Sequence, residues 1–311
     1  MIAAEKIARL RENIQKVFVG KDETADKLII GMLAQGHLLI EDIPGVGKTV
    51  LAKALARSID VGFSRIQFTP DLLPTDILGV SVFNAEREDF VFKKGPIFAN
   101  VILADEINRT TPRTQSSLLE AMNDRQVSCD GTTYRLPRPF IVIATQNPHE
   151  FEGTYPLPES QLDRFLMRVT IGYPSEDQER RILTDQKTTH PLDTLEPVLT
   201  ADDVIELQKQ VREIKLDGVV MDYLLKIISE TRQSDALEVG ASPRASLNLS
   251  RAAQARALMH ERDYCMPDDA KVLATSVLSH RLIGKSRMGP SRNGTIDEIL
   301  MEIVDSIPVP V

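Results

Sequence analysis

One stretch constrains the fold of this chain more than any other: an apolar run that ends at Ile40, then a loop with glycines, then a helical sequence. Pro44, Gly45 and Gly47 interrupt regular structure, and a run of good helix formers begins at Lys48. The stretch therefore predicts strand, loop and helix. Such a loop turns backbone N–H groups inward, and the helix N-terminus behind it adds partial positive charge. We expect an anion-binding turn here.

The loop fits the pattern G-x-x-x-x-G-K-[ST], except that Asp42 stands where the pattern has its first glycine. In loops of this pattern, Lys48 would reach the β- and γ-phosphates of a nucleotide, and the Thr49 hydroxyl would hold Mg²⁺. The alternative is an ordinary strand-to-helix turn that happens to contain glycines. The residues further along the chain favour the phosphate-binding loop.

A second apolar run, residues 101–104, ends in the adjacent carboxylates Asp105 and Glu106. A continuous apolar run is typical of a strand buried in a parallel sheet, and open α/β sheets bind ligands at the carboxyl ends of their strands. We therefore expect Asp105 to complete the Mg²⁺ shell with Thr49, and Glu106 to polarise an attacking water as a general base. An Asp-Glu pair alone usually only begins a polar loop. Because this pair ends a buried run that follows a phosphate-binding loop, we favour the catalytic interpretation.

A third apolar run, residues 140–144, leads to Asn147. An amide at this strand end can hydrogen-bond the γ-phosphate and orient water without carrying charge; the alternative is a turn asparagine before proline. Arg164, taken alone, would be interpreted as a surface arginine. Arg244 follows a helix start with Ser242 as N-cap. The helix dipole disfavours a cation on the first turn, which implies a compensating anion such as a bound phosphate.

The charge balance argues against some classes of partner. The net charge is −8, from 37 basic and 45 acidic residues, so the chain as a whole does not match nucleic acid or an anionic membrane. Cys129 and Cys265 have no metal-ligand spacing, and we expect free thiols in a reducing compartment. No apolar run approaches a membrane span, and the N-terminus lacks a signal-peptide pattern. We expect a cytoplasmic protein without membrane insertion.

The composition changes at residues 173–176, and only helical periodicity follows. We predict an α/β domain with a parallel sheet over residues 1–173 and a smaller all-α domain over residues 174–311. In the second domain we expect helices at 176–185, 201–214, 219–233, 243–260, 267–279 and 295–304, and a basic loop at 284–294. In the first we expect helices at 2–18, 22–35 and 115–125, further strands at 63–68 and 167–171, and hairpins at 80–92 and 126–136.

Together these segments resemble an AAA+ ATPase, and within that superfamily they are similar to the MoxR group. The resemblance covers essentially the whole chain and rests on residues 41–49, 104–109, 144–148, 162–165 and 240–245. It implies that residues 45–49 are the Walker A loop and that Asp105 and Glu106 are the Walker B pair. Asn147 is similarly placed to sensor 1. Arg164 resembles an arginine finger that reaches the γ-phosphate of a neighbouring subunit, and Arg244 resembles sensor 2.

The resemblance also implies a P-loop AAA+ sheet domain followed by a helical lid, with ATP and Mg²⁺ as cofactors. Residues 70–98 look like the helix-2 insert and residues 126–139 like the pre-sensor insert, and Val19 and Gly20 match the segment near adenine. The expected catalytic residues are Lys48, Glu106, Asn147, Arg164 and Arg244. The expected nucleotide-binding residues are Val19, Gly20, Pro44, Gly45, Val46, Gly47, Lys48, Thr49 and Val50, and the expected metal ligands are Thr49 and Asp105.

For function, the MoxR resemblance implies a homo-oligomeric ring, commonly a hexamer. It implies a chaperone-like role in assembling or activating partner proteins, often von Willebrand factor A proteins or metalloenzymes. The alternative is a nucleic-acid-associated AAA+ motor, against which the acidic balance argues. A non-catalytic, nucleotide-gated scaffold would lack the carboxylates, whereas Asp105 and Glu106 are both present.

Overall fold

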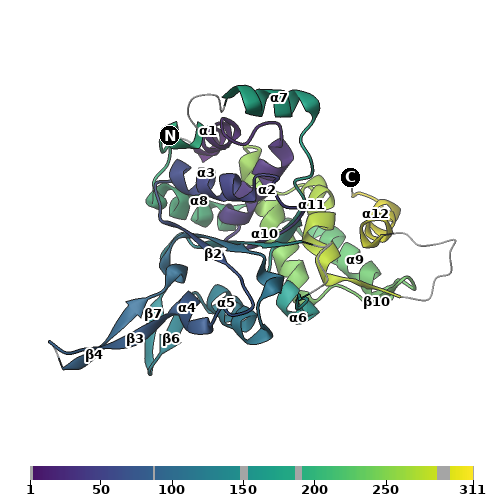
Figure 1. The fold of residues 1–311 in the computed structure, drawn as a ribbon. Coiled ribbons are helices and arrows are strands. Elements are labelled where there is room, and N and C mark those ends of the chain that lie inside the picture. The colour runs from purple at the N-terminus through teal and green to yellow at the C-terminus, as the bar shows by residue number, and fades with distance from the viewer. Residues whose placement is uncertain (1–2, 87, 148–152, 186–190, 286–294, 311) are drawn as a thin grey trace.

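The centre of the molecule is a five-stranded parallel sheet, in the strand order β2-β5-β8-β1-β9 (Figure 1). The computed structural model describes residues 3–86, 88–147, 153–185, 191–285 and 295–310. Because β5, β8 and β1 are neighbours, the ends of the three apolar runs meet at one edge of the sheet. The strands are β1 (Leu38–Glu41), β2 (Phe63–Gln67), β5 (Val101–Asp105), β8 (Ile141–Gln146) and β9 (Met167–Val169).

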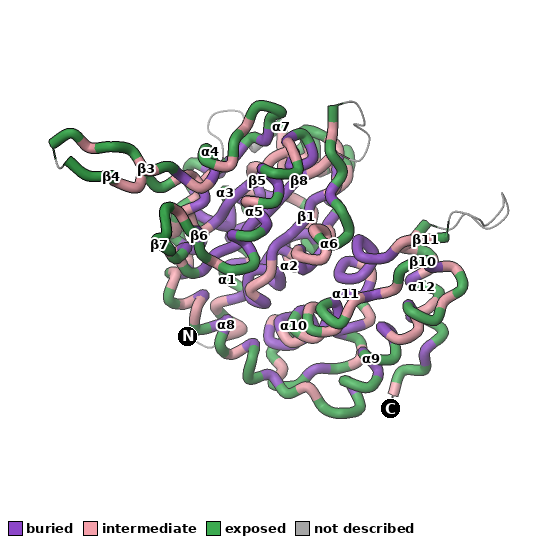
Figure 2. Tube along the Cα trace, turned by 90° about the horizontal axis from the view of Figure 1, so that it is seen from below, coloured by how far each residue is buried: buried purple, intermediate pink, exposed green. Residues whose placement is uncertain are grey.

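Helices cover both faces of this sheet, so the central strands β1, β5 and β8 are buried on both sides (Figures 1 and 2). In β1, Leu38 and Ile40 pack into one apolar cluster and Leu39 into the other. Burial on both faces explains why these strands are continuous apolar runs without alternation. One face carries α1 (Ala3–Gln15), α2 (Asp22–Leu33) and α3 (Lys48–Ser58), and the other carries α4 (Pro74–Leu78) and α5 (Pro112–Asp124).

The helical lid predicted from the sequence is confirmed. Its longest helix, α10, packs against α1, α2 and α8, so the lid and one face of the sheet share a single apolar cluster. The lid differs from the prediction in one detail, a short antiparallel pair of β10 (Leu237–Val239) and β11 (Ile283–Gly284), which are too short for an alternating pattern to be recognised. The lid helices are α7 (Glu176–Asp185), α8 (Ala201–Glu213), α9 (Gly218–Gln233), α10 (Pro243–Met259), α11 (Pro267–Leu278) and α12 (Ile296–Ser306).

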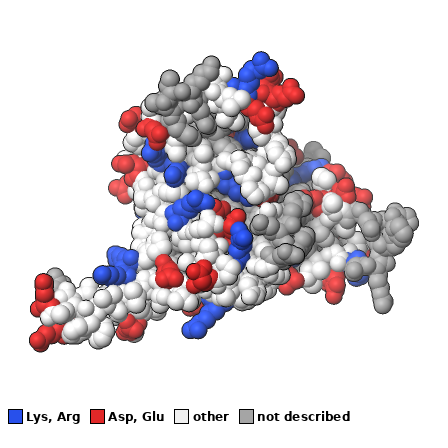
Figure 3. Space-filling view, viewed as in Figure 1, with Lys and Arg blue, Asp and Glu red and all other residues white. Residues whose placement is uncertain are grey.

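Two hairpins extend from the face that carries α4 and α5 (Figure 1). They confirm the two predicted hairpins: β3 (Gly79–Asn84) pairs with β4 (Asp89–Lys94), and β6 (Gln126–Cys129) pairs with β7 (Thr132–Arg135). Acidic side chains gather at the far end of the β3–β4 hairpin, while both signs of charge mix over the rest of the visible face (Figure 3).

The local start signals of two helices act as hydrogen-bonded caps. The Ser242 side chain accepts a hydrogen bond from the backbone N–H of Ala245, which confirms the predicted N-cap of α10. Helix α5 begins at Pro112, earlier than the predicted residue 115, because Thr111 caps it in the same way. Both cysteines are free thiols. No helix within the described ranges has the length and apolar character needed to cross a membrane. Most of the predicted basic loop at 284–294 lies outside the described residues.

His37, just before β1, joins three elements of the core. Its Nδ1 accepts a hydrogen bond from the backbone N–H of Val142 in β8 at 3.0 Å, so Nε2 carries the proton that is donated to the carbonyl of Met122 in α5 at 3.2 Å. Burial, with a smaller contribution from the nearby charge of Arg125, lowers the pKa of His37 to about 4 although the hydrogen bond to Met122 opposes the shift. The imidazole is therefore neutral near pH 7.

The depressed pKa of His37 predicts a loss of stability in mild acid. Below pH 6.5 the unfolded chain binds a proton at His37 that the folded protein does not bind. The free energy of unfolding therefore falls as the pH falls to about 4. The substitution His37→Gln should reduce the pH dependence of the free energy of unfolding in this range by about 1.4 kcal/mol per pH unit. Urea unfolding of both proteins at pH 7, 6 and 5 measures the difference. Parallel pH profiles would contradict this role of His37.

Candidate active site

The loop between β1 and α3 has the geometry of a phosphate-binding turn. Gly45 and Gly47 have φ angles of 86° and 95°, a left-handed conformation that side chains with a Cβ rarely adopt. Gly47 is the N-cap of α3, so the N–H groups of the first helical turn point toward the loop without an intrahelical partner. Lys48 and Thr49 begin the helix. The loop therefore fits the phosphate chain of a nucleotide.

Asp42, the departure from the generic loop pattern, is a structural anchor. Its side chain is buried, and Oδ2 accepts hydrogen bonds from the backbone N–H groups of Ile171 and Gly172 at 2.6 and 2.7 Å. Oδ1 accepts a third from the N–H of Ile43 at 2.8 Å. The carboxylate thus ties the start of the loop to the chain that follows β9. A glycine could not make this connection, and sequence comparison with the pattern alone did not reveal it.

Lys48 lies beside the acidic end of the sheet. Its ammonium group donates to the backbone carbonyl of Asp42 at 2.6 Å. Burial lowers the pKa of Lys48, while the negative charges of Asp42, Asp105 and Glu106 oppose that shift. These charges act on Lys48 because the end of β5 and the loop share one edge of the sheet. The predicted grouping of Lys48 with both carboxylates is therefore present in the structure.

Thr145 of β8 holds both carboxylate residues in place. Its hydroxyl donates to Oδ1 of Asp105 at 2.7 Å and accepts from the backbone N–H of Glu106 at 2.9 Å. Glu106 has a left-handed backbone, with φ of 58°, a conformation uncommon for residues other than glycine. Asn147 follows β8 directly, so it lies at the same edge, between the strands that carry the loop and the carboxylates. Pro148 lies outside the described residues.

Strand β2 supplies two contacts that the sequence analysis missed. Arg65 donates to Oδ2 of Asp105 at 2.5 Å, and Gln67 donates to Oε2 of Glu106 at 2.8 Å. Arg109 donates to the same oxygen of Glu106 at 3.0 Å. Residues 65 and 67 point to one side of β2 because side chains alternate along a strand, and this spacing was the signal that could have revealed them. In this structure both carboxylates are engaged by the chain itself.

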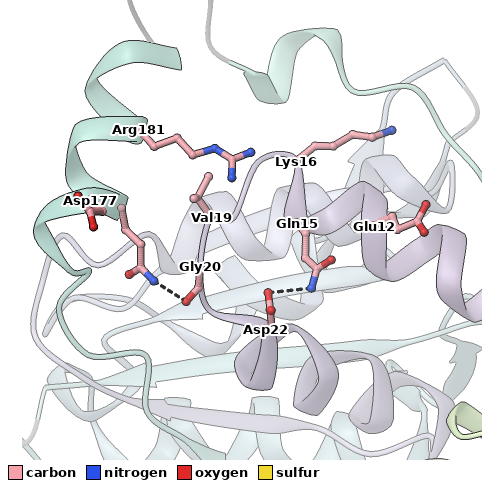
Figure 4. Close-up of a pocket in the computed structure, with 9 residues that line it drawn as sticks. Glu12, Gln15, Lys16, Val19, Gly20, Asp22, Asp177 and Arg181 are labelled. Atoms are coloured by element: carbon pink, nitrogen blue, oxygen red, sulfur yellow. Dashed lines mark hydrogen bonds between the residues drawn. The ribbon is translucent and has the colours of Figure 1, made fainter.

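The expected adenine segment lies next to the loop. Val19 lines a cavity of about 200 Å³ together with Gly45, Val46, Gly47 and Val50. Gly20 lines an adjoining pocket instead, where its carbonyl accepts a hydrogen bond from Nε2 of Gln178 in α7 at 2.8 Å (Figure 4). Pro44 is exposed and lines neither of these pockets.

Arg164 and Arg244 lie together, but not in the loop cavity of the same chain. Both line a separate pocket of about 280 Å³, which shares no lining residue with the cavity beside the loop. Arg244 donates a hydrogen bond to Oδ1 of Asn123 in α5. The chain thus divides the candidate residues between two places: the loop, both carboxylates and Asn147 at the sheet edge, and the two arginines in the other pocket.

A parallel sheet with a phosphate-binding loop, paired carboxylates after β5 and a helical lid defines a P-loop ATPase of the AAA+ class. Residues 37–167 match the family described as "ATPase family associated with various cellular activities (AAA)", and residues 229–303 match "AAA lid domain". The chain belongs to the MoxR family of AAA+ ATPases.

The chain is similar to other proteins over nearly its whole length. The chain is 49% identical to the uncharacterized protein YeaC of Bacillus subtilis, over 96% of this chain and 93% of that protein. It is 41% identical to chaperone MoxR1 of Mycobacterium tuberculosis, over 94% of this chain and 78% of that protein. A crystal structure of a protein from Cytophaga hutchinsonii superimposes with a TM-score of 0.90 and 36% identity, covering 99% of this chain and 96% of that one.

Replacing Asp42 by glycine would restore the generic loop pattern, yet we expect it to destabilise the protein. The substitution Asp42→Gly leaves the N–H groups of Ile171 and Gly172 without their acceptor, which should cost about 2–4 kcal/mol of unfolding free energy. Asp42→Asn keeps one oxygen acceptor and should lose less. Urea denaturation measures both variants. If Asp42→Gly is as stable as the wild type, the anchoring role is refuted.

Proposed function

We propose that this chain hydrolyses ATP with the help of Mg²⁺, and that it does so as a homo-oligomeric ring in which each site is completed by a second copy. The observation that carries this proposal is the grouping of Lys48, Asp105 and Glu106 at the phosphate-binding end of the sheet. Family membership supports ATP hydrolysis in general. By the family resemblance we expect the ring to be a hexamer.

The donor set at the sheet edge fits a magnesium nucleotide. The Thr49 hydroxyl and the Asp105 carboxylate are oxygen ligands of the kind that Mg²⁺ prefers. Bound Mg²⁺ would neutralise negative charge on the phosphates. The loop N–H groups and Lys48 would hold the phosphates, Val19, Gly20 and the residues beside the loop would hold the rest of the nucleotide, and Asn147 would orient the attacking water. The nucleotide-binding loop residues of the proposal are Pro44, Gly45, Val46, Gly47, Lys48, Thr49 and Val50.

Glu106 would take the proton of the attacking water as a general base. In the present arrangement its carboxylate accepts from Gln67 and Arg109, and Asp105 accepts from Arg65. The contacts of Glu106 involve Oε2 and the contact of Asp105 with Arg65 involves Oδ2, so these oxygens would exchange partners if they took part in hydrolysis. Arg164 and Arg244 would complete the site from another copy, because both lie in a pocket away from the loop of their own chain.

For the biological role, we propose chaperone-like assembly or activation of a partner protein. One relative of this chain is named a chaperone, which supports the role. The resemblance to the MoxR group suggests a partner with a von Willebrand factor A domain, or a metalloenzyme client. A Glu106→Gln variant, held in ATP, should retain such a partner for identification by mass spectrometry. Recovery of DNA and replication proteins instead would favour a nucleic-acid motor.

If Glu106 is the general base, its replacement should affect ATP hydrolysis but not ATP binding. Glu106→Gln should bind ATP as the wild type does but hydrolyse it at least about a hundredfold more slowly, because general base catalysis contributes roughly 10²–10⁴-fold. Binding is measured with a fluorescent ATP analogue and hydrolysis by phosphate release. Wild-type turnover in this variant would exclude Glu106 as the base. Turnover per wild-type subunit should also rise with protein concentration, and a flat dependence would count against a shared site.

The contact between Arg65 and Asp105 predicts a competition with the metal. In Arg65→Ala the carboxylate of Asp105 loses a cationic partner at 2.5 Å, so Mg²⁺ should bind more readily. The Mg²⁺ concentration for half-maximal hydrolysis should fall relative to wild type. Arg65→Lys retains a cation and is the matched control. An unchanged Mg²⁺ requirement in Arg65→Ala would show that Arg65 does not compete at this carboxylate.

A further inference from the structure

Four arginines from three parts of the chain line the pocket that contains Arg164 and Arg244. The other two are Arg125 and Arg251, and we call the site the arginine pocket. Arg244 and Arg251 lie seven residues apart on α10, which places them on the same side of that helix. Arg125 is the C-cap of α5, and Arg164 lies just before β9. The fold thus brings four guanidinium groups to one cavity.

The arginine pocket has no negative charge of its own. Its other lining residues are neutral: Gln35, Gly36, His37, Met122, Asn123, Leu166, Leu247 and Asn248. His37 stays uncharged near pH 7 because burial lowers its pKa to about 4. Among the described residues, no carboxylate forms an ion pair with any of the four arginines.

Two of these arginines donate hydrogen bonds to neutral oxygen atoms of the protein. Arg125 donates to the side-chain and backbone oxygens of Gln35, each at 3.0 Å, and Arg244 donates to the amide oxygen of Asn123. Burial lowers the pKa of Arg125, and the nearby charges of Arg138, Arg212 and Arg251 lower it further. Clustered cations without counter-charge repel one another, so a bound anion would stabilise the pocket.

The partly buried ion pair of Asp163 and Arg281 helps to hold together the segments that carry Arg164 and Arg244. Asp163, next to Arg164, accepts from the hydroxyl of Ser242 at 3.2 Å, and Ser242 caps the helix that carries Arg244. The guanidinium of Arg281 donates to Asp163 at 2.8 Å and also to the carbonyl of Phe165, on the other side of Arg164. The segments that carry Arg164 and Arg244 are therefore held together, as a preformed anion site requires.

We propose that Arg125 and Arg251 complete, with Arg164 and Arg244, a pocket that binds the phosphate groups of a nucleotide held in the loop of a second copy of this chain. The planar guanidinium fork matches phosphate oxygens, and several forks in one pocket favour a polyphosphate. The nucleotide belongs to another copy because the arginine pocket and the loop cavity of one chain share no residue. This inference rests on the function proposed above, and it adds Arg125 and Arg251 as binding residues.

The direct test uses ATP with a photoreactive azidoanilide on the γ-phosphate, which labels the chain that lies beside that phosphate. Tagged Lys48→Ala chains, whose own loop is impaired, are mixed with untagged chains that have an intact loop. We expect label on the tagged chains in the mixture, little on the tagged chains alone, and roughly a tenfold or greater loss of that label when Arg251→Ala is added to them. Arg180→Ala, which removes an exposed arginine of α7 outside the pocket, is the matched control and should leave the labelling unchanged.

Each outcome of the labelling has a distinct meaning. Label found only on the chains with an intact loop would overturn the proposal that the pocket serves another copy. Equal labelling with and without Arg251→Ala would overturn the assignment of Arg251. If no chain is labelled and the wild type neither binds nor hydrolyses ATP, the proposed function fails as well, so the two failures are distinguishable.

A second test measures ATP turnover by the Arg251→Ala variant alone. Arg251 is exposed, so its removal should leave the melting temperature unchanged while turnover falls roughly ten- to hundredfold. Arg251→Lys keeps the charge without the fork and should lose less. Wild-type turnover in Arg251→Ala would contradict the proposal. Loss of binding to a single-stranded oligonucleotide, with phosphate labelling unchanged, would instead assign the pocket to nucleic acid and overturn it.

Discussion

Burial of the parallel sheet on both faces is the constraint on which the rest of the structure depends. Because helices cover the two faces, the central strands β1, β5 and β8 carry polar side chains only at their carboxyl ends. At the carboxyl ends these groups satisfy one another. The Thr145 hydroxyl bridges Asp105 and the backbone of Glu106, and the Asp42 carboxylate fastens the loop to the chain after β9. The same bonds that allow polar groups to be buried also fix the geometry of the candidate site.

The lid also helps to fix the geometry of the candidate site through polar contacts with the sheet domain. Arg281 in the lid donates to Asp163 beside Arg164, and Asp163 also accepts from Ser242 at the start of α10. On the other side, Arg168 in β9 contacts both Glu41 at the end of β1 and Asp297 at the start of α12. Continuous hydrogen-bonded contacts therefore run from each of the two sites into the lid. If the lid moves with these contacts intact, the positions of Arg164 and Arg244 and of the end of β1 would shift together.

The positions of the candidate residues are the basis for proposing a site shared between two copies. The loop lines one cavity and both carboxylates lie at the end of β5, whereas Arg164 and Arg244 line another pocket that has four arginines and no carboxylate in its lining. Neither cavity has all the charges that phosphoryl transfer to water requires. In addition, the contacts of Asp105 with Arg65 and of Glu106 with Gln67 occupy both carboxylates in this structure. In the proposed function, a second copy completes the site and these contacts rearrange when the nucleotide binds.

The sequence by itself determined the elements whose signals are local. Glycines followed by Lys-Thr predicted the loop, apolar runs predicted three buried strands, and Ser242 predicted a helix start, since each depends on residues close together in the chain. Only the tertiary structure decided which distant side chains meet. Asp42 binds backbone groups about 130 positions away, and the arginine pocket draws on four elements of the fold. No local pattern encodes such contacts, because they arise when separate elements pack against one another.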